Sequence, residues 1–278
     1  MARQMFIHEI IASPTALTEK QSSKIKFLNW NIRNPSIKRA KEQSEWILQT
    51  NADVIILTEA KYSEGSRFIQ DWLESHAFDV FLPQPPNNND YCVMIATKRL
   101  ISKRLELSVN FLPCRAVSIV SEIFLEKIRI IGLYVPSRGS VERRNVDKRK
   151  FQYQIIDLLR LLADEFQSSG FVICGDLNVL ERNHIPHYSV FGEWEYEFYE
   201  SFIKAGLVDA YRLVNPSTKE YSWFGKKGNG YRFDHFFVST ILSQSIVDCS
   251  YIHTPRSLKL SDHSAMYLEI DFSPQAEP

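Results

Sequence analysis

Phe171 to Asn178, with the sequence F-V-I-C-G-D-L-N, carries the clearest structural signal in the chain. Its first four residues are apolar, and mostly β-branched or aromatic, and glycines precede and follow them, which favours a buried strand. Gly175 lets the chain leave the sheet, and Asp176 and Asn178 follow directly. Proteins of the α/β class often carry their chemistry at such a strand end, although Asp and Asn also form ordinary turns there. The stretch therefore predicts either a functional strand end or an Asx-type turn.

Other short apolar segments surround this one, and the predicted strands outnumber the predicted helices. Strands are predicted at residues 24–31, 54–57, 91–97, 105–109, 116–125, 128–134, 171–174, 232–239, 247–253 and 264–271, and helices at 36–49, 64–76, 145–167 and 194–205. Consecutive strands between residues 91 and 134 predict antiparallel hairpins, with Glu126-Lys127 as the tightest turn. The order favours an α/β fold in which two sheets pack face to face with helices outside.

Composition excludes several classes of protein. The chain has 278 residues, with 33 Lys+Arg and 33 Asp+Glu, so its overall field would not attract a polyanion, although a local basic face could. The four cysteines are widely spaced and form no C-x-x-C pair, which favours buried thiols in a reducing compartment. No apolar run approaches the roughly 20 residues needed to span a bilayer. We expect a cytoplasmic protein with no membrane contact, an N-terminal extension at residues 1–23 and a single catalytic domain at residues 24–278.

Polar residues recur where the predicted apolar strands end, and we expect them to share one site. They are Asn31, Glu59, Tyr134, Asp176 with Asn178, Asp234, and Asp262 with His263. Any one of them could be a simple turn former. Oxygen and amide ligands without a Cys or His cluster favour Mg²⁺ or Mn²⁺ over zinc, and one His beside several carboxylates suits phosphoryl chemistry. The G-x-S-x-G elbow of serine hydrolases and the phosphate-binding loop G-x-x-x-x-G-K-[ST] are both absent.

Five motifs resemble the endonuclease/exonuclease/phosphatase superfamily, and within it the exonuclease III-like AP endonucleases. In chain order they are A-D-V-I-I-L-T-E-A-K (52–61), C-G-D-L-N (174–178), D-A-Y-R (209–212) with Y-S-W-F (221–224), G-N-G-Y-R-F-D (228–234) and L-S-D-H (260–263). The resemblance runs from about residue 24 to residue 271. It implies a DNase I-like four-layer α/β sandwich, that is, two packed mixed β-sheets flanked by helices, and a metal-dependent phosphoesterase.

The resemblance also implies roles for single residues. Mg²⁺ or Mn²⁺ would be held by Glu59, Asn31 and Asp262. Asp176 would orient or deprotonate the attacking water, and His263, oriented by Asp234, would stabilise charge in the transition state. The residues expected to hold phosphate oxygens are Asn178 and Tyr134.

Two features depart from the AP-endonuclease pattern. Arg33 stands where the pattern N-x-D places an Asp ligand. A cation there should weaken metal binding unless it pairs with Glu59 or binds a substrate phosphate, which favours a single-metal site. The segment 181–200 is acidic and aromatic and does not resemble the stretch that follows G-D-L-N in AP endonucleases, which weakens the expectation of abasic-site recognition.

The candidate substrate-binding residues are Arg33, Arg138, Arg232 and Trp223. Arg138 begins a basic run that extends to Lys150 and suits either a solvated helix start or contact with a phosphate backbone. Trp223 lies in the aromatic Y-S-W-F motif, whose rings could stack on a base or pack in the core.

These observations favour a Mg²⁺- or Mn²⁺-dependent nuclease, endo- or exonucleolytic, whose partner is nucleic acid, with DNA favoured over RNA. One alternative is a phosphatase or phosphodiesterase for a non-nucleic phosphoester. Another is a catalytically weak nucleic-acid-binding module in which Arg33 has displaced the metal.

Overall fold

Two six-stranded mixed sheets stack face to face in the computed structural model, which describes residues 23–123, 126–139 and 142–273. The first sheet has the order β13 (Ile246–Ile252), β14 (Ala265–Asp271), β1 (Lys24–Asn31), β2 (Val54–Lys61), β4 (Tyr91–Lys98) and β3 (Phe78–Phe81). The second has the order β5 (Ile101–Leu105), β6 (Ala116–Ile123), β7 (Glu126–Tyr134), β8 (Gly170–Asp176), β12 (Asp234–Ser239) and β9 (Leu207–Asp209). A small ribbon joins β10 (Trp223–Phe224) to β11 (Gly230–Tyr231).

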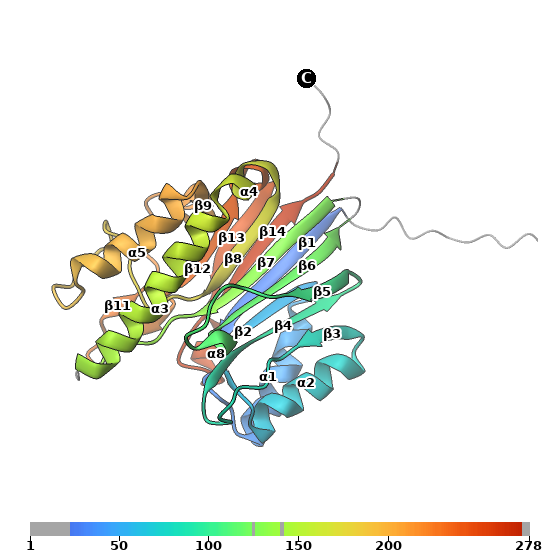
Figure 1. The fold of residues 1–278 in the computed structure, drawn as a ribbon. Helices are drawn as coiled ribbons and strands as arrows, with labels where there is room; N and C mark the ends of the chain where they lie inside the picture. Colours follow the sequence, from blue (N-terminus) through green and yellow to red (C-terminus); the bar gives the residue numbers. More distant parts are fainter. Residues whose placement is uncertain (1–22, 124–125, 140–141, 274–278) are drawn as a thin grey trace, which may run out of the picture.

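Helices cover the outer face of each sheet (Figure 1). The first sheet is covered by α1 (Ile37–Gln49) and α2 (Glu64–Ser75), and the second by α3 (Glu142–Leu161), α4 (Ala163–Ser168) and α5 (Glu193–Lys204). Short helices lie in the connections: the 3₁₀ turn η1 (Pro113–Arg115), α6 (Ala210–Val214), α7 (Thr240–Ser243) and α8 (Thr254–Ser257). The expected four-layer α/β sandwich is confirmed.

The apolar run Phe171 to Cys174 lies in β8, an interior strand of the second sheet. Val172 and Cys174 face the other sheet, whereas Phe171 and Ile173 face the helices. Successive side chains of a strand point to opposite faces, so a strand that is covered on both sides has to be apolar throughout.

Gly175 lies in β8 opposite Leu133 of β7 and has a φ of +148°. A Cβ atom at this position would lie 1.8 Å from the carbonyl oxygen of Leu133. Only glycine permits this approach, and the backbone then carries Asp176 to the end of the sheet.

Several sequence expectations need correction. The strand expected at residues 105–109 is β5 at Ile101–Leu105, which forms an edge whose charged residues hid it from the apolar pattern. Strand β5 pairs with β6, whereas β4 belongs to the other sheet. The consecutive strands β4 and β5 therefore do not form a hairpin. Glu126 and Lys127 lie in β7, paired with β6, and are not the turn. The helix expected at 145–167 is divided at Leu162 into α3 and α4.

The expected extension at residues 1–23 lies outside the described residues except for Ser23. Ser23 accepts a hydrogen bond of 2.9 Å from the backbone N–H of Phe272, beside the start of β1. Among the helices that the structure describes, none is long and apolar enough to cross a membrane.

Candidate active site

Parallel strands bring four of the expected residues to one end of the sandwich. Asn31 ends β1 and Glu59 lies near the end of β2, and these strands run parallel in the first sheet. In the second sheet β7 and β8 are also parallel, and their last residues, Tyr134 and Asp176, are paired in register. The ends of the two sheets meet here, because hydrogen bonds join Asn31 to Asp176 and Tyr134 to Glu59.

Asp234, Asp262 and His263 lie at the same end of the sandwich, but at the beginnings of strands and not at their ends. Asp234 is the first residue of β12, and Asp262 and His263 precede β14, so none of them follows a strand as expected. These strands run antiparallel to β8 and β1, which places their beginnings beside the ends of their partners. Asp234 is accordingly paired in register with Asp176.

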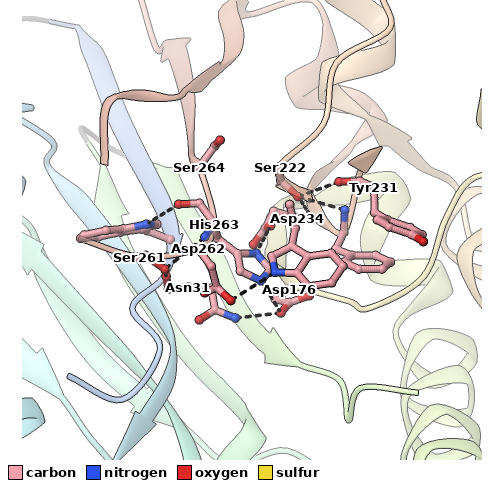
Figure 2. Close-up of polar contacts among 12 residues, drawn as sticks. Asn31, Asp176, Ser222, Tyr231, Asp234, Ser261, Asp262, His263 and Ser264 are labelled. Carbon is pink, nitrogen blue, oxygen red and sulfur yellow. Dashed lines mark hydrogen bonds and ion pairs between the residues drawn. The ribbon is translucent and has the colours of Figure 1, made fainter. Parts of the chain in front are cut away.

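The carboxylate of Asp176 is fully buried and is held on both oxygens. Oδ2 accepts a hydrogen bond of 2.9 Å from Asn31 Nδ2, and Oδ1 accepts one of 3.0 Å from the backbone N–H of Asn178. His263 lies between two acids, with Nδ1 2.8 Å from Asp234 Oδ2 and Nε2 3.9 Å from Asp176 Oδ2 (Figure 2). Asp234 therefore orients the imidazole so that its other nitrogen faces Asp176.

Burial and neighbouring charges shift the pKa values of Asp176 and His263. Burial, and then the negative charge of Asp234, raise the pKa of Asp176 to about 8. Burial lowers the pKa of His263, but the charge of Asp234 and the hydrogen bond to it outweigh that effect and raise the pKa to about 10. A carboxyl with a pKa near neutrality suits a general base, and an imidazolium suits the stabilisation of developing negative charge.

The donors at the expected metal site suit a hard cation held largely by water. Glu59 Oε1 accepts a 3.0 Å hydrogen bond from Tyr134, and Glu59 Oε2 has no partner within the described residues. Asn31 Oδ1 accepts a bond from the backbone N–H of Arg33, and Asp262 Oδ2 accepts one of 3.2 Å from Trp223 Nε1. The described ranges contain no cluster of three or more His, Cys, Asp or Glu side chains placed to hold a metal. Mg²⁺ is commonly held by one or two carboxylates and several waters, which fits Glu59 as its protein ligand.

Several residues with positive φ, and an irregularity in strand pairing, lie at the same end of the sandwich. The pairing of β2 with β4 shifts register between Leu57 and Ala60, and Glu59 lies in this irregularity with a φ of 54°. Arg33 and Asn178 have φ values of 53° and 50°. Bulges re-aim side chains, and positive φ values at residues other than glycine are costly and cluster at functional sites. The bulge explains how Glu59 reaches the site from within a strand.

A pocket of about 480 Å³ opens onto these residues. Its polar lining is formed by Glu59, Asp176, Asn178, Asp262 and His263. Its aromatic lining is formed by Phe191, Trp223, Tyr231 and Phe233, and Arg138 also lines the pocket. The rings of Trp223 and Phe233 lie 5.8 Å apart and those of Tyr231 and Phe233 are stacked. Trp223 of the Y-S-W-F motif therefore both packs against other aromatic rings and lines the pocket.

Three of the four expected substrate-binding residues lie at or beside this pocket. Arg138 and Trp223 line it, and exposed Arg33 has its Nε 3.8 Å from Asp262 Oδ1. The expectation for Arg232 is wrong, because its side chain is fully buried and its Nη2 lies 2.8 Å from Asp209 Oδ2. Tyr134 is 3% exposed and its hydroxyl orients Glu59, so its expected contact with phosphate stays a prediction.

The basic residues between Arg138 and Lys150 are not all exposed to solvent, and not all of them lie at the pocket. Lys148 is fully buried and both Lys148 and Arg138 bind Glu195, whereas Arg149 and Lys150 lie over the rings of Trp194 and Phe111. These partners are distant in sequence, so charge spacing alone gave no sign of them.

Sequence reasoning also missed two serines that support the acids. Ser222 Oγ accepts the backbone N–H groups of Phe233 and Asp234, which places Asp234 (Figure 2). Ser261 Oγ donates to the carbonyl of Asn31 over 2.6 Å and accepts from the backbone N–H of His263. Both serines lie inside motifs named above, and that position was the only available signal.

Comparison with known proteins agrees with this geometry. Residues 28–263 match the sequence model described as the Endonuclease/Exonuclease/phosphatase family. An exodeoxyribonuclease of Bacillus subtilis is 24% identical over 256 residues, covering 81% of this chain and 92% of the relative. A DNA-(apurinic or apyrimidinic site) endonuclease of Dictyostelium discoideum is 23% identical, covering 91% of this chain and 72% of the relative.

Solved structures show the same fold. An AP endonuclease from Archaeoglobus fulgidus superposes with a TM-score of 0.71 at 21% identity, covering 89% of this chain and 99% of its own. A 3′ phosphatase from Neisseria, NExo, bound to a product DNA hairpin, superposes with a TM-score of 0.72 at 19% identity, covering 89% of this chain and 99% of its own.

Proposed function

The chain belongs to the Endonuclease/Exonuclease/phosphatase family, and we propose that it is a hydrolase that cleaves phosphodiester bonds of nucleic acid with Mg²⁺ or Mn²⁺. The observation that carries the proposal is the arrangement of Asp176 and His263. Asp176 is held on both oxygens at the floor of the pocket, and His263 faces it across 3.9 Å while Asp234 orients the ring.

This arrangement supplies the parts that hydrolysis of a phosphodiester needs. Asp176, with a pKa raised to about 8, accepts a proton from the attacking water. The imidazolium of His263, with a pKa raised to about 10, donates a hydrogen bond to a negatively charged phosphoryl oxygen. A divalent cation at Glu59 would neutralise the phosphate charge that otherwise repels the nucleophile.

DNA is the favoured substrate. The curated relatives named above are an exodeoxyribonuclease and a DNA-(apurinic or apyrimidinic site) endonuclease, and the NExo structure contains DNA. The aromatic lining of Trp223, Tyr231 and Phe233 gives the sugar or base beside the scissile phosphate an apolar surface. Arg138 and Arg33 are the cations placed to contact backbone phosphates.

Labelled single-stranded, double-stranded and abasic oligonucleotides test the proposal. The purified protein should shorten at least one of them with Mg²⁺ or Mn²⁺, and a chelator should stop the reaction. Asp176→Asn, prepared identically, is the control for a contaminating nuclease. The lengths of the products distinguish endonucleolytic from exonucleolytic cleavage.

A 3′ phosphatase is the second candidate, favoured by the likeness to NExo and by the pocket, which is large enough for a chain terminus. In that case a 3′-phosphorylated oligonucleotide would lose inorganic phosphate while the chain kept its length. Salt-sensitive binding of DNA without turnover on either substrate would instead support a binding module in which Arg33 has displaced the metal.

We also infer a cytoplasmic location. The four cysteines are free, and Cys92, Cys174 and Cys249 are buried, which is usual for proteins of reducing compartments. Fractionation of cells that express the protein, with detection by antibody, tests this inference.

A further inference from the structure

A buried cation lies behind the G-D-L-N segment, outside the pocket. Lys148, on α3, has no exposed side-chain surface. Its Nζ donates a 2.7 Å hydrogen bond to the carbonyl oxygen of Asn178 and a 2.5 Å bond to Oε1 of Glu195. Burying an ammonium group is unfavourable because it loses its hydration, and a surface position on the same helix would avoid that loss.

Glu195, on α5, is the acidic partner of this ammonium group. Its carboxylate is also fully buried, and Oε2 accepts hydrogen bonds from Arg138 Nη1 and from the backbone N–H of Gly192. Burial lowers the pKa of Lys148, while the charge of Glu195 opposes that shift. The pair also joins α3 to α5, the two long helices that cover this side of the second sheet (Figure 1).

Asn178 is held at every polar group of its backbone. Its carbonyl accepts from Lys148, its N–H donates to Asp176 Oδ1 over 3.0 Å, and its φ is 50°. Its side-chain Nδ2 donates 3.0 Å to the carbonyl of Val135, which leaves Oδ1 without a partner among the described residues. Asparagine tolerates a positive φ better than most residues other than glycine, so φ alone does not demand Lys148. Lys148 is the side chain that binds the Asn178 carbonyl, the one backbone group of this residue that is held from another element.

We propose that Lys148, held by Glu195, is a positioning residue that holds the Asn178 peptide and thereby aims the Asp176 carboxylate. Lys148 does not line the pocket, so it acts through Asn178 and not on the substrate. The proposal rests on the hydrolase function proposed above.

Lys148→Met tests the proposed positioning role. Lys148→Arg and the double variant Lys148→Met/Glu195→Gln are measured in the same series. Lys148→Met keeps an unbranched side chain one atom shorter than lysine and removes the donor, and Glu195 remains paired with Arg138. We expect kcat to fall about a hundredfold, as expected for a catalytic group displaced by ~1 Å, while KM stays unchanged. Lys148→Arg should recover part of kcat, because a guanidinium can still donate to the carbonyl of Asn178.

The double variant separates positioning from stability. Removing both buried charges should recover the urea midpoint lost in Lys148→Met, but it should not recover kcat, because Asn178 still lacks its donor. Lys204→Met, at the exposed end of α5, is the control for loss of a lysine and should behave as wild type. A double variant with wild-type kcat would overturn the proposal.

Amide hydrogen exchange at Asn178, followed by NMR, reports without any substrate on the hydrogen bond from the Asn178 N–H to Asp176 Oδ1, which Lys148 is proposed to hold in place from the carbonyl side. Exchange should be faster in Lys148→Met and in the double variant, and unchanged in Lys204→Met. Unchanged exchange in Lys148→Met would overturn the proposal even if activity fell. A wild-type protein that hydrolyses no phosphoester would refute the proposed function, whereas the exchange result would still decide the role of Lys148.

Discussion

Asn31 and Asp176, which lie 145 residues apart in the sequence, are joined by a 2.9 Å hydrogen bond from Nδ2 to Oδ2. Asn31 ends β1 in the first sheet and Asp176 ends β8 in the second, so the bond joins the two sheets at the candidate active site. It also leaves Asp176 with one donor on each oxygen.

Asn31→Ala should therefore reduce catalysis more than it reduces stability. Loss of one hydrogen bond to a buried carboxylate costs about 1–3 kcal/mol in unfolding free energy, whereas misdirection of the base should lower kcat about a hundredfold. Urea unfolding and steady-state kinetics on the substrate found above measure both effects. Wild-type kcat in a folded Asn31→Ala protein would show that this bond does not orient the base.

Asp176→Asn should remove turnover and leave substrate binding in place. The amide is nearly isosteric but cannot accept a proton at neutral pH, so we expect a loss in kcat of about 10²–10⁴. Fluorescence anisotropy with labelled DNA should give a Kd near that of wild type. The urea midpoint should not fall, since the change removes a buried acid that burial and Asp234 already disfavour in its charged form.

Asp234→Asn should change the pH dependence of stability. The pKa of His263 is raised to about 10, above the unfolded value of about 6.5. The contribution of the imidazolium is therefore fully present below about pH 6.5 and is lost as the pH rises through about 10. Without the Asp234 carboxylate the pKa of His263 falls, so this loss should move to lower pH in urea unfolding series. An identical pH profile in both proteins would show that Asp234 is not the main cause of the raised pKa of His263.

Arg33→Asp should tighten metal binding. The Arg33 guanidinium lies 3.8 Å from Asp262 Oδ1, beside the donors expected to hold the cation, and its charge repels a divalent ion. The Mg²⁺ concentration for half-maximal activity should therefore fall. Lys38→Met, on the exposed face of α1, removes one positive charge away from the site and should leave this concentration unchanged. Weaker metal binding in Arg33→Asp would show that Arg33 acts mainly by orienting Asp262.

Arg232→Met should destabilise the fold with no specific effect on substrate. The guanidinium is buried against Asp209 and Glu181, so its loss leaves a buried negative charge without its partner. Breaking a buried ion pair from one side costs about 3–5 kcal/mol, measurable as a lower urea midpoint. KM should stay at the wild-type value below the unfolding transition. A raised KM with unchanged stability would restore Arg232 as a substrate contact.

Elements with a local signal could be predicted from the amino-acid sequence. The apolar run before Gly175 predicted β8 because a strand covered on both faces must be apolar, and the polar residues at its end were correctly expected to meet others in one place. The edge strand β5 was misplaced because its charged residues carry no such pattern.

The assembly of the site, and which charged side chains are exposed, depend on contacts that form in the folded protein. Asp234 and His263 reach Asp176 from the beginnings of strands, since antiparallel pairing reverses their direction. Arg232 and Lys148 look like surface cations in the sequence, yet Asp209 and Glu195 hold them in the interior. A charge becomes structural or available according to partners that are distant along the chain, and spacing along the chain does not encode those contacts.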